Sequence, residues 1–221
     1  MKLDKFWNGL KRIANGDYVL EGDLIFDENL EVELDDRLVV TGNIEVKKSI
    51  TAGCGIKAGE GITAGCGITA GWGIKAGEGI KAGCGIKAGC GITAGCGITA
   101  GCGITAGWGI KAGTFIHCKK RIFAGVSVYR TSKDCDKVIK CAELQKGEIC
   151  YGELVIEPYL KPCPFCGNKA VKVCSSEEIN GEGFSAKSYA VLCSISDGGC
   201  GASGGYKDTR EEAVANWNQR A

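Results

Sequence analysis

The residues of this chain best suited to bind a ligand are cysteines near its C-terminal end. Cys163 and Cys166 are separated by two residues and followed by Gly167, in the run LKPCPFCGN. Two thiolates at this spacing can bind one metal ion when the turn is tight, and Gly167 can adopt the left-handed conformation that directs backbone amides at the sulfur atoms. The spacing is typical of a zinc knuckle, so we expect one structural Zn²⁺ here.

A second pair of ligands is expected after a hairpin formed by AVKVC, a polar loop at 175–186 and KSYAVLC. Cys193 and Cys200 supply it, although six residues separate them instead of two. Strict two-residue spacing would pair Cys200 with Asp197, and Cys174 is a further candidate. We choose Cys193 as the fourth ligand because all-cysteine sets are common in structural zinc sites and aspartate is uncommon in them.

A two-stranded ribbon and a helix must position these ligands. Thr209 and Glu212 form a capping box, and Ala213, Val214 and Trp217 define one apolar helix face. The ordered set LKPCPFCG, CGA and T-x-E-E-A-V-x-x-W-N-x-R resembles the Lar-type restriction alleviation proteins, small phage and prophage products that protect DNA from host restriction. The resemblance covers residues 160–221 and implies a small ββα zinc ribbon over 159–221.

A six-residue repeat fills the middle of the chain. Ile recurs at every sixth position from 50 to 110, in eleven units such as ITAGCG, IKAGEG and ITAGWG. A period of six suits one side of a β-solenoid coil, a three-residue strand followed by a three-residue corner. The same phase continues more loosely to Val32, Leu38 and Ile44 upstream and to Ile116, Ile122 and Val128 downstream. The sequence therefore predicts a single-chain β-solenoid over 17–130, with perfect hexads at 50–113.

Variation among the units indicates which positions face inward. Ile and the Ala two places later never vary, whereas the residue between them is Thr or Lys and the fifth is Cys, Glu, Trp or Thr. We therefore expect Ile and Ala in the core and the variable positions outside. With three units in each coil, residues 18 apart stack in columns: Cys66, Cys84 and Cys102; Cys54, Trp72, Cys90 and Trp108; Glu60, Glu78 and Cys96. These cysteines fit small residues tolerated at exposed corners, and a thiol or metal ladder is the alternative.

The repeat resembles hexapeptide-repeat and bactofilin-like solenoids. Hexapeptide-repeat acyltransferases use a histidine base, and this chain has one histidine, His117, at the frayed end of the repeat beside Cys118-Lys119-Lys120-Arg121. No excursion loop interrupts the perfect units to build a substrate pocket. We therefore expect no enzyme activity and interpret His117 as an ordinary surface residue.

The ends of the solenoid need protection, because exposed terminal strands would polymerise. The spacing of Leu3, Phe6, Trp7, Leu10, Ile13 and Ala14 predicts an amphipathic capping helix over 1–16, with a membrane-surface helix as the alternative. Residues 17–45 carry ten acids against Arg37, which we interpret as a solvated face, with a DNA-mimic surface as the alternative. Residues 131–158 are predicted to form a β-hairpin connector around Gln145-Lys146-Gly147, with Cys135, Cys141 and Cys150 structural or free.

Charge and composition limit the partners. The chain has net charge +1, and seven basic residues of the ribbon balance seven acids, so binding of nucleic acid is not expected. The first twenty residues lack a signal-peptide core and no stretch is long enough to span a membrane, which favours the cytoplasm of a bacterial host. We expect a non-catalytic phage or prophage accessory protein that binds a host defence protein. A bactofilin-like scaffold that self-associates and a nucleic-acid-binding zinc ribbon are the alternatives.

Overall fold

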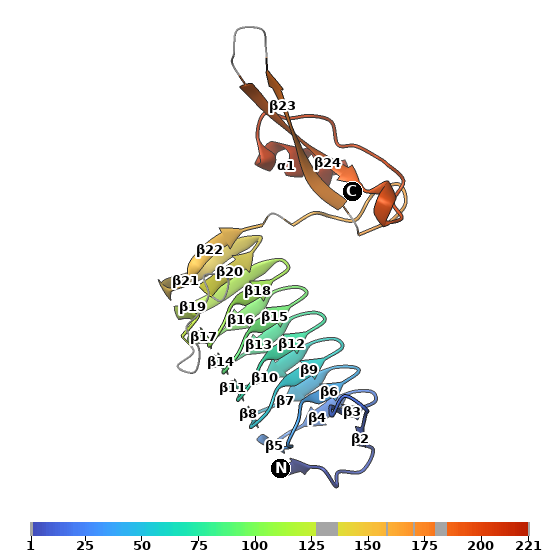
Figure 1. Cartoon of the computed structure of the whole chain (residues 1–221). Coiled ribbons are helices and arrows are strands. Elements are labelled where there is room, and N and C mark those ends of the chain that lie inside the picture. The colour runs from blue at the N-terminus through green and yellow to red at the C-terminus, as the bar shows by residue number, and fades with distance from the viewer. Residues whose placement is uncertain (1, 127–136, 158, 170, 180–184, 221) are drawn as a thin grey trace. The chain divides into compact units, whose positions relative to one another are not determined.

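The structure is a computed structural model that describes residues 2–126, 137–157, 159–169, 171–179 and 185–220. The chain forms two compact units, residues 1–157 and residues 158–221 (Figure 1). The first contains a β-solenoid of about seven turns over residues 18–156. The second is a small domain with two strands and one helix in its described residues. The mainly β architecture expected from the repeat and the ribbon is therefore confirmed.

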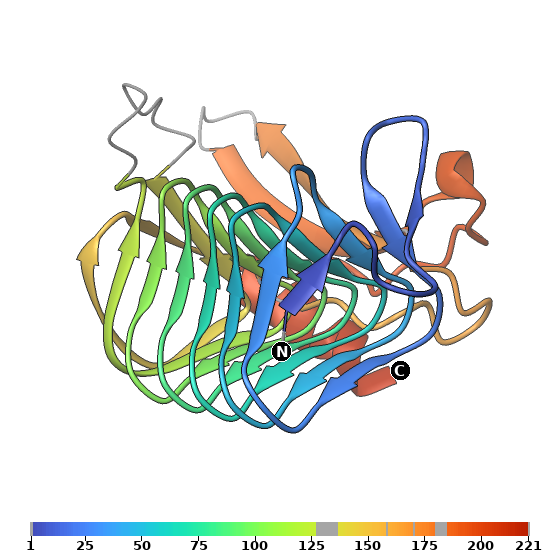
Figure 2. The ribbon, with the colours of Figure 1, turned by 90° about the horizontal axis from the view of Figure 1, so that it is seen from below.

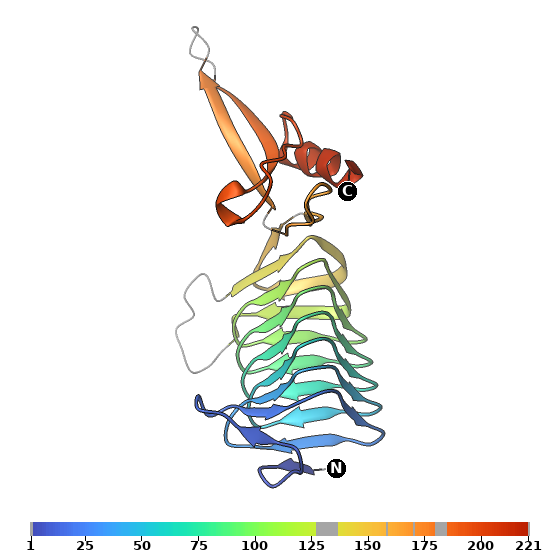
Figure 3. The same cartoon turned by 90° about the vertical axis from the view of Figure 1, so that its right-hand side faces the viewer.

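The solenoid strands stack in three columns, one on each face of the coil (Figures 1 and 3). The first face contains β1 (Lys2–Asp4), β5 (Leu30–Glu33), β8 (Ile50–Ala52), β11 (Ile68–Ala70), β14 (Ile86–Ala88) and β17 (Ile104–Ala106). The second contains β2 (Lys11–Arg12), β3 (Tyr18–Leu20), β6 (Leu38–Val40), β9 (Ile56–Ala58), β12 (Ile74–Ala76), β15 (Ile92–Ala94), β18 (Ile110–Ala112), β20 (Val138–Cys141) and β22 (Glu153–Ile156). The third contains β4 (Leu24–Phe26), β7 (Ile44–Val46), β10 (Ile62–Ala64), β13 (Ile80–Ala82) and β16 (Ile98–Ala100). Strand β19 (Phe115–Ala124) continues both the first and the third face, and β21 (Glu143–Tyr151) pairs with it.

The core of the solenoid consists of the residues that never vary. All eleven repeat isoleucines are at most 1 % exposed and the alanines at most 4 %, whereas the Thr or Lys between them faces outward. Each isoleucine lies in register with the isoleucine 18 residues away, as Ile62 does with Ile80. The corner columns form as predicted, since Cys84 donates its backbone N–H to Cys66 and Glu78 donates to Glu60. Cys54 is the exception at the outward fifth position, being only 3 % exposed.

The first coils are longer than the repeat predicts. Tyr18, Leu24 and Leu30 pair with Leu38, Ile44 and Ile50, which are 20 residues away rather than 18. Leu30 therefore occupies the isoleucine position, and Val32 lies opposite Ala52 instead of Ile50. The assignment of Val32 to the isoleucine phase is corrected accordingly, and Val128 lies outside the described residues.

The predicted helix over 1–16 is wrong. Residues 2–4 form β1, which pairs in parallel with β5, and residues 11–12 form β2, which pairs antiparallel with β3. The open strand edges of the first coil offer backbone hydrogen bonds that a helix could not satisfy. Leu3 is fully buried, and Trp7 and Leu10 pack against the core, so this segment covers the end of the solenoid as strands and turns (Figure 2). Phe6, by contrast, is 82 % exposed.

The hairpin predicted over 131–158 is also wrong where the structure describes it. Strand β20 pairs in parallel with β18 on one side and with β22 on the other, and β21 pairs in parallel with β19. Ile139 lies in register with Ile110 and is fully buried, so the solenoid core continues through this segment. Gln145-Lys146-Gly147 lies inside β21 rather than in a turn. Cys141 is buried and Cys150 exposed, and Cys135 falls outside the described residues.

The second unit is the predicted ribbon and helix. Strands β23 (Val171–Ile179) and β24 (Ser185–Cys193) pair antiparallel, and α1 (Arg210–Arg220) packs on them. The Thr209 hydroxyl accepts the N–H of Glu212 at 3.2 Å, as a helix N-cap should. Trp217 is 1 % exposed and its indole N–H donates to the Lys161 carbonyl at 2.9 Å, which holds the segment before the first knuckle against the helix. No helix among the described residues is long and apolar enough to cross a membrane.

Candidate metal centre

Four cysteine thiols of the second unit converge on one point. The Sγ atoms of Cys163, Cys166, Cys193 and Cys200 all lie within 4.8 Å of one another. Cys163 and Cys200 are 3.6 Å apart at sulfur, and so are Cys166 and Cys193. An all-sulfur set of four at this separation fits a tetrahedral metal site. The structure thus brings together the four residues chosen from the sequence, while their role as ligands remains a prediction.

Two short loops position these thiols. In the first, Gly167 has φ of +69° and donates its N–H to the Cys163 carbonyl at 2.8 Å, the left-handed turn expected after the two-residue spacing. The Cys163 N–H donates in turn to the Asn168 carbonyl at 2.9 Å. In the second, Cys193 ends β24, and a 3-10 turn over Ile195–Asp197 lengthens the path to Cys200. This turn accounts for the six-residue separation between the second pair of cysteines.

The two alternative ligands lie elsewhere. Cys174 is an exposed residue of β23 and does not belong to the thiol cluster. The Asp197 carboxylate contacts the Lys172 ammonium at 2.6 Å, and this contact lowers the pKa of Asp197. Asp197 is therefore engaged by a lysine instead of pointing at the sulfur atoms. The backbone carbonyl of Asp197 also accepts the Asn168 amide at 3.1 Å, which joins the two loops.

The thiols of the cluster differ in their acidity. A backbone hydrogen bond at Asn168 lowers the pKa of Cys166 to about 7. Burial raises the pKa of Cys193 to about 12. At Cys200 the backbone hydrogen bond of Ala202 lowers the pKa, but the neighbouring thiols and burial outweigh it and the pKa is raised. Four thiolates so close together repel one another, and a divalent cation is what allows all of them to ionise.

Comparison with known proteins supports the assignment of this unit. Residues 158–221 match the family model of restriction alleviation protein Lar. Comparisons with curated proteins and with solved structures found no match. The Lar match covers the whole thiol cluster and helix α1, and it begins just after the last strand of the solenoid, β22.

Two apolar side chains of this Lar-type ribbon lie in the loops that hold the thiols, and neither was among the residues predicted from the sequence. Phe165 lies between the first two cysteines and Ile195 between the second two, and each is 74 % exposed. A shallow hollow at Ile195 is lined by Lys172, Cys174, Leu192, Cys193, Ser194, Ile195 and Gly201. The signal available in the sequence was a large apolar residue inside each of the two cysteine loops.

The other residues that could do chemistry, one histidine and several cysteines, belong to the solenoid. His117 is half-buried on β19, in register with Thr99 on one side and Lys146 on the other. Cys66 and Cys84 are exposed at the solenoid corners. Cys118 is fully buried, and burial raises the pKa of its thiol, which donates to the Cys102 carbonyl. These thiols behave as packing or corner residues of the solenoid.

Proposed function

We propose that the protein counters host restriction by binding a protein of the defence system, with the Lar-type ribbon as the recognition module. The family match of residues 158–221 supports an anti-restriction role. The observation that carries the binding mode is the exposure of Phe165 and Ile195, at 74 % each, on the two loops that hold the thiols. Both loops also hold the clustered thiols, and exposed large apolar side chains that gather on one surface are typical of protein interaction sites.

We propose further that the protein acts without catalysis. The four cysteines form a complete tetrahedral set, which leaves no open coordination position for water or substrate. A closed site of this kind stabilises a small domain and does not perform hydrolysis. Zn²⁺ is the ion that such a set prefers, and its role here would be to hold the two loops, and so Phe165 and Ile195, in place. The target, in this proposal, is in the bacterial cytoplasm.

The solenoid is proposed to serve as an arm that carries the ribbon. Its core is repetitive, and its outward positions vary without affecting the fold. A second candidate function is that of a scaffold assembling through the solenoid ends, and one observation favours it. Strand β4 terminates the third face at the N-terminal end, with no further strand beyond it in the described residues. Filaments of the purified full chain in electron microscopy would support the scaffold.

The anti-restriction proposal is tested by phage plating. Expression of the full chain in a restricting bacterial host should raise the plating efficiency of unmodified phage. The double variant Phe165→Ala with Ile195→Ala should lose this protection while retaining its metal content, because neither side chain is a ligand. Phe6→Ala, which removes an equally exposed aromatic ring from the solenoid, is the matched control and should protect as the parent does. Equal protection by all three proteins would contradict the proposed binding surface.

A further inference from the structure

The lysines of the repeat are concentrated on one face of the solenoid. Position two of the hexad reads Lys57, Lys75, Thr93 and Lys111 along the second face, and Lys140 follows in register on β20. The other two faces together carry two lysines in seven units, Lys81 and Lys87. Adjacent parallel strands are about 4.8 Å apart, so this lysine row extends for roughly 19 Å from Lys57 to Lys140.

The fold does not need this row. Thr occupies the same outward position in six of the eleven units, so Lys is not required there for folding. Lys57 and Lys75 are direct neighbours in the parallel ladder, and like charges in such positions repel each other. Neither of them, nor Lys111, has an ion-pair partner among the described residues. Repulsion between neighbouring lysines works against folding. Such an arrangement is expected where an anionic ligand neutralises the charges.

The acidic N-terminal part of the solenoid, by comparison, has most of its charges neutralised by ion pairs within the chain. Six of the ten acids in residues 17–45 form ion pairs, with Lys2, Lys11, Arg12, Arg37, Lys47 and Lys48. Residues 49–120, by contrast, contain seven lysines and two acids. The neutral balance of the whole chain therefore conceals an acidic end that is largely paired and a middle segment with a net charge of 7 − 2 = +5. The two acids of this segment, Glu60 and Glu78, follow β9 and β12 at the next corner and form no ion pair among the described residues. Arguments from net charge do not apply to this face.

Aromatic side chains line one edge of the lysine row. Trp72 and Trp108 occupy the corner that precedes the second face, each in the run Trp-Gly-Ile-Lys, so that each lies three residues before a lysine of the row. The backbone of this column is continuous, since Cys90 donates its N–H to Trp72 and Trp108 donates to Cys90. Trp72 is 45 % exposed, an unusual exposure for the largest apolar side chain. Trp108 is half-buried. A row of cations beside an exposed aromatic ring is a combination that binds single-stranded nucleic acid through phosphates and stacked bases.

The lysine row is interrupted at Thr93, and the surface is hollowed there. A hollow with a cavity volume of about 210 Å³ lies where the short Thr93 side chain interrupts the lysines, and Lys111 and Lys140 line it. Lys140 also contacts Glu157 at 2.9 Å, so its charge is partly compensated. The hollow could hold an anionic group next to Thr93, Lys111 and Lys140. We propose that the second face of the solenoid binds a single-stranded nucleic acid, with its phosphates along Lys57, Lys75 and Lys111 and a base stacked on Trp72.

The proposal is tested by fluorescence anisotropy with labelled oligo(dT) and the zinc-loaded full chain. The triple variant Lys57→Thr, Lys75→Thr and Lys111→Thr should weaken binding by about tenfold or more and lower the slope of log affinity against log salt by about 2. The control variant Lys81→Thr, Lys87→Thr and Lys119→Thr removes the same charge from other positions and should bind much as the parent does. Trp72→Thr should weaken binding by about tenfold. Circular dichroism and thermal melting check that all variants are folded.

Two outcomes would overturn the proposal. If both triple variants lose the same affinity, the binding is a general charge effect and the second face has no special role. If polyglutamate or duplex DNA competes as well as oligo(dT) and Trp72→Thr binds normally, stacking makes no contribution. An acidic protein surface or a duplex would then be the partner of the lysine row. Because the test uses solenoid variants alone, its failure would leave the proposed role of the ribbon unaffected.

Discussion

The carbonyl oxygen of Gly59 lies 1.8 Å from the point that a Cβ atom on Gly77 would occupy. The same contact recurs one six-residue unit later, where a Cβ on Gly83 would lie 1.9 Å from the Gly65 carbonyl oxygen. No glycine between residues 50 and 113 has a positive φ angle, so these glycines are not there to allow a left-handed turn. They are required because successive coils approach too closely for a side chain.

This contact predicts a difference between the two glycines of a unit. Gly77→Ala should reduce the free energy of unfolding of the solenoid by at least about 2 kcal/mol, because backbone must move to relieve the clash. Gly79→Ala should change it by less than about 1 kcal/mol, because its new Cβ would meet the Gly97 carbonyl oxygen at an acceptable 3.4 Å. Thermal or denaturant unfolding of the two variants measures the difference. Equal destabilisation would show that turn conformation, and not stacking distance, selects glycine.

The alternation of inward and outward positions gives a second prediction. Ile80 is 1 % exposed, so Ile80→Asp places an unpaired charge in the core and should unfold the solenoid or destabilise it by more than about 4 kcal/mol. Lys81→Thr at the next, exposed position should be nearly silent, since Thr is common there. Circular dichroism with urea unfolding separates the two. Similar tolerance of both changes would contradict the strand register.

The middle of the solenoid could be predicted from sequence because the same residue types recur at the same positions in every unit. Eleven copies of Ile and Ala at fixed positions identify the core without any knowledge of long-range contacts. The first coils could not be predicted in the same way, because their two extra residues are absorbed in corners and leave no periodic signal. The pairing of Leu30 with Ile50 is visible only in the folded chain.

The N-terminal segment shows why local pattern can mislead. The spacing of Leu3, Trp7 and Leu10 fits a helix face, yet all three also reach the core from strand and turn conformations. The deciding factor is the open edge of β5, which lies almost thirty residues away in sequence and provides hydrogen bonds to β1. In the ribbon, the same kind of long-range information distinguished Cys193 from Cys174. Both lie on adjacent strands, and only the fold shows which thiol faces the others.

The role of the N-terminal segment in covering the first coil of the solenoid can be tested by truncation. Deletion of residues 1–12 removes β1 and β2 and should expose the edges of β5 and β3, together with the apolar surface under Leu3 and Trp7. Exposed edges of this kind pair with other chains, so we expect concentration-dependent association in light scattering. Phe6→Ala serves as a control because that ring is already in solvent. A truncated chain that remains monodisperse would mean that the first coil protects itself.

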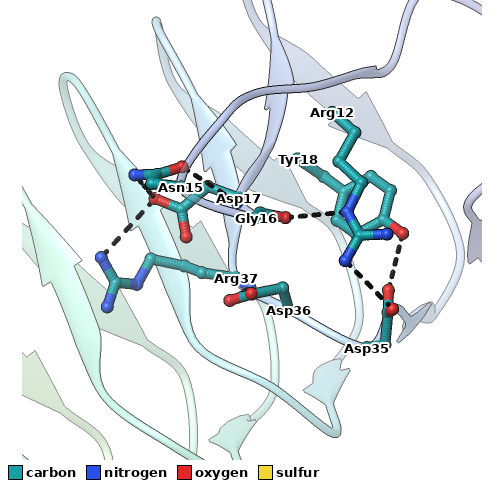
Figure 4. A network of polar contacts seen from close by, with 8 residues as sticks. All are labelled: Arg12, Asn15, Gly16, Asp17, Tyr18, Asp35, Asp36 and Arg37. Carbon is teal, nitrogen blue, oxygen red and sulfur yellow. Dashed lines mark hydrogen bonds and ion pairs between the residues drawn. The ribbon is translucent and has the colours of Figure 1, made fainter.

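The hydroxyl of Tyr18 is expected to make the stability of the N-terminal coil depend on pH. It donates to the Asp35 carboxylate at 2.6 Å, and Arg12 lies over the ring and reaches the same carboxylate (Figure 4). The hydrogen bond lowers the pKa of Asp35 below its ordinary 3.8. A lowered pKa means that this contribution to stability is present above about pH 4 and is lost as the pH falls through the pKa of the folded state.

Hydrogen exchange, corrected for intrinsic rates, checks this pH dependence. Protection of residues 17–40 in the parent protein should decrease between pH 5 and about pH 3. Tyr18→Phe should already be less protected at pH 5 and should respond less to acid, because the bond that lowers the pKa is gone. Tyr151→Phe, on the last strands of the solenoid, should behave as the parent does. An unchanged pH response in Tyr18→Phe would assign the acid sensitivity to other carboxylates.

The metal centre supplies the last prediction. One zinc ion should bind per chain, and each of the variants Cys163→Ser, Cys166→Ser, Cys193→Ser and Cys200→Ser should lower the zinc content. Cys174→Ser and Asp197→Asn are the controls and should retain it, because neither side chain lies among the four thiols. Chelation should abolish hydrogen-exchange protection in residues 159–221, since a domain with so small a core depends on its ion for folding. The solenoid, with its own continuous core of isoleucines, should keep its protection. Loss of zinc from Cys174→Ser but not from Cys193→Ser would overturn the fourth ligand, and full retention in a chain lacking both Cys163 and Cys166 would exclude the site.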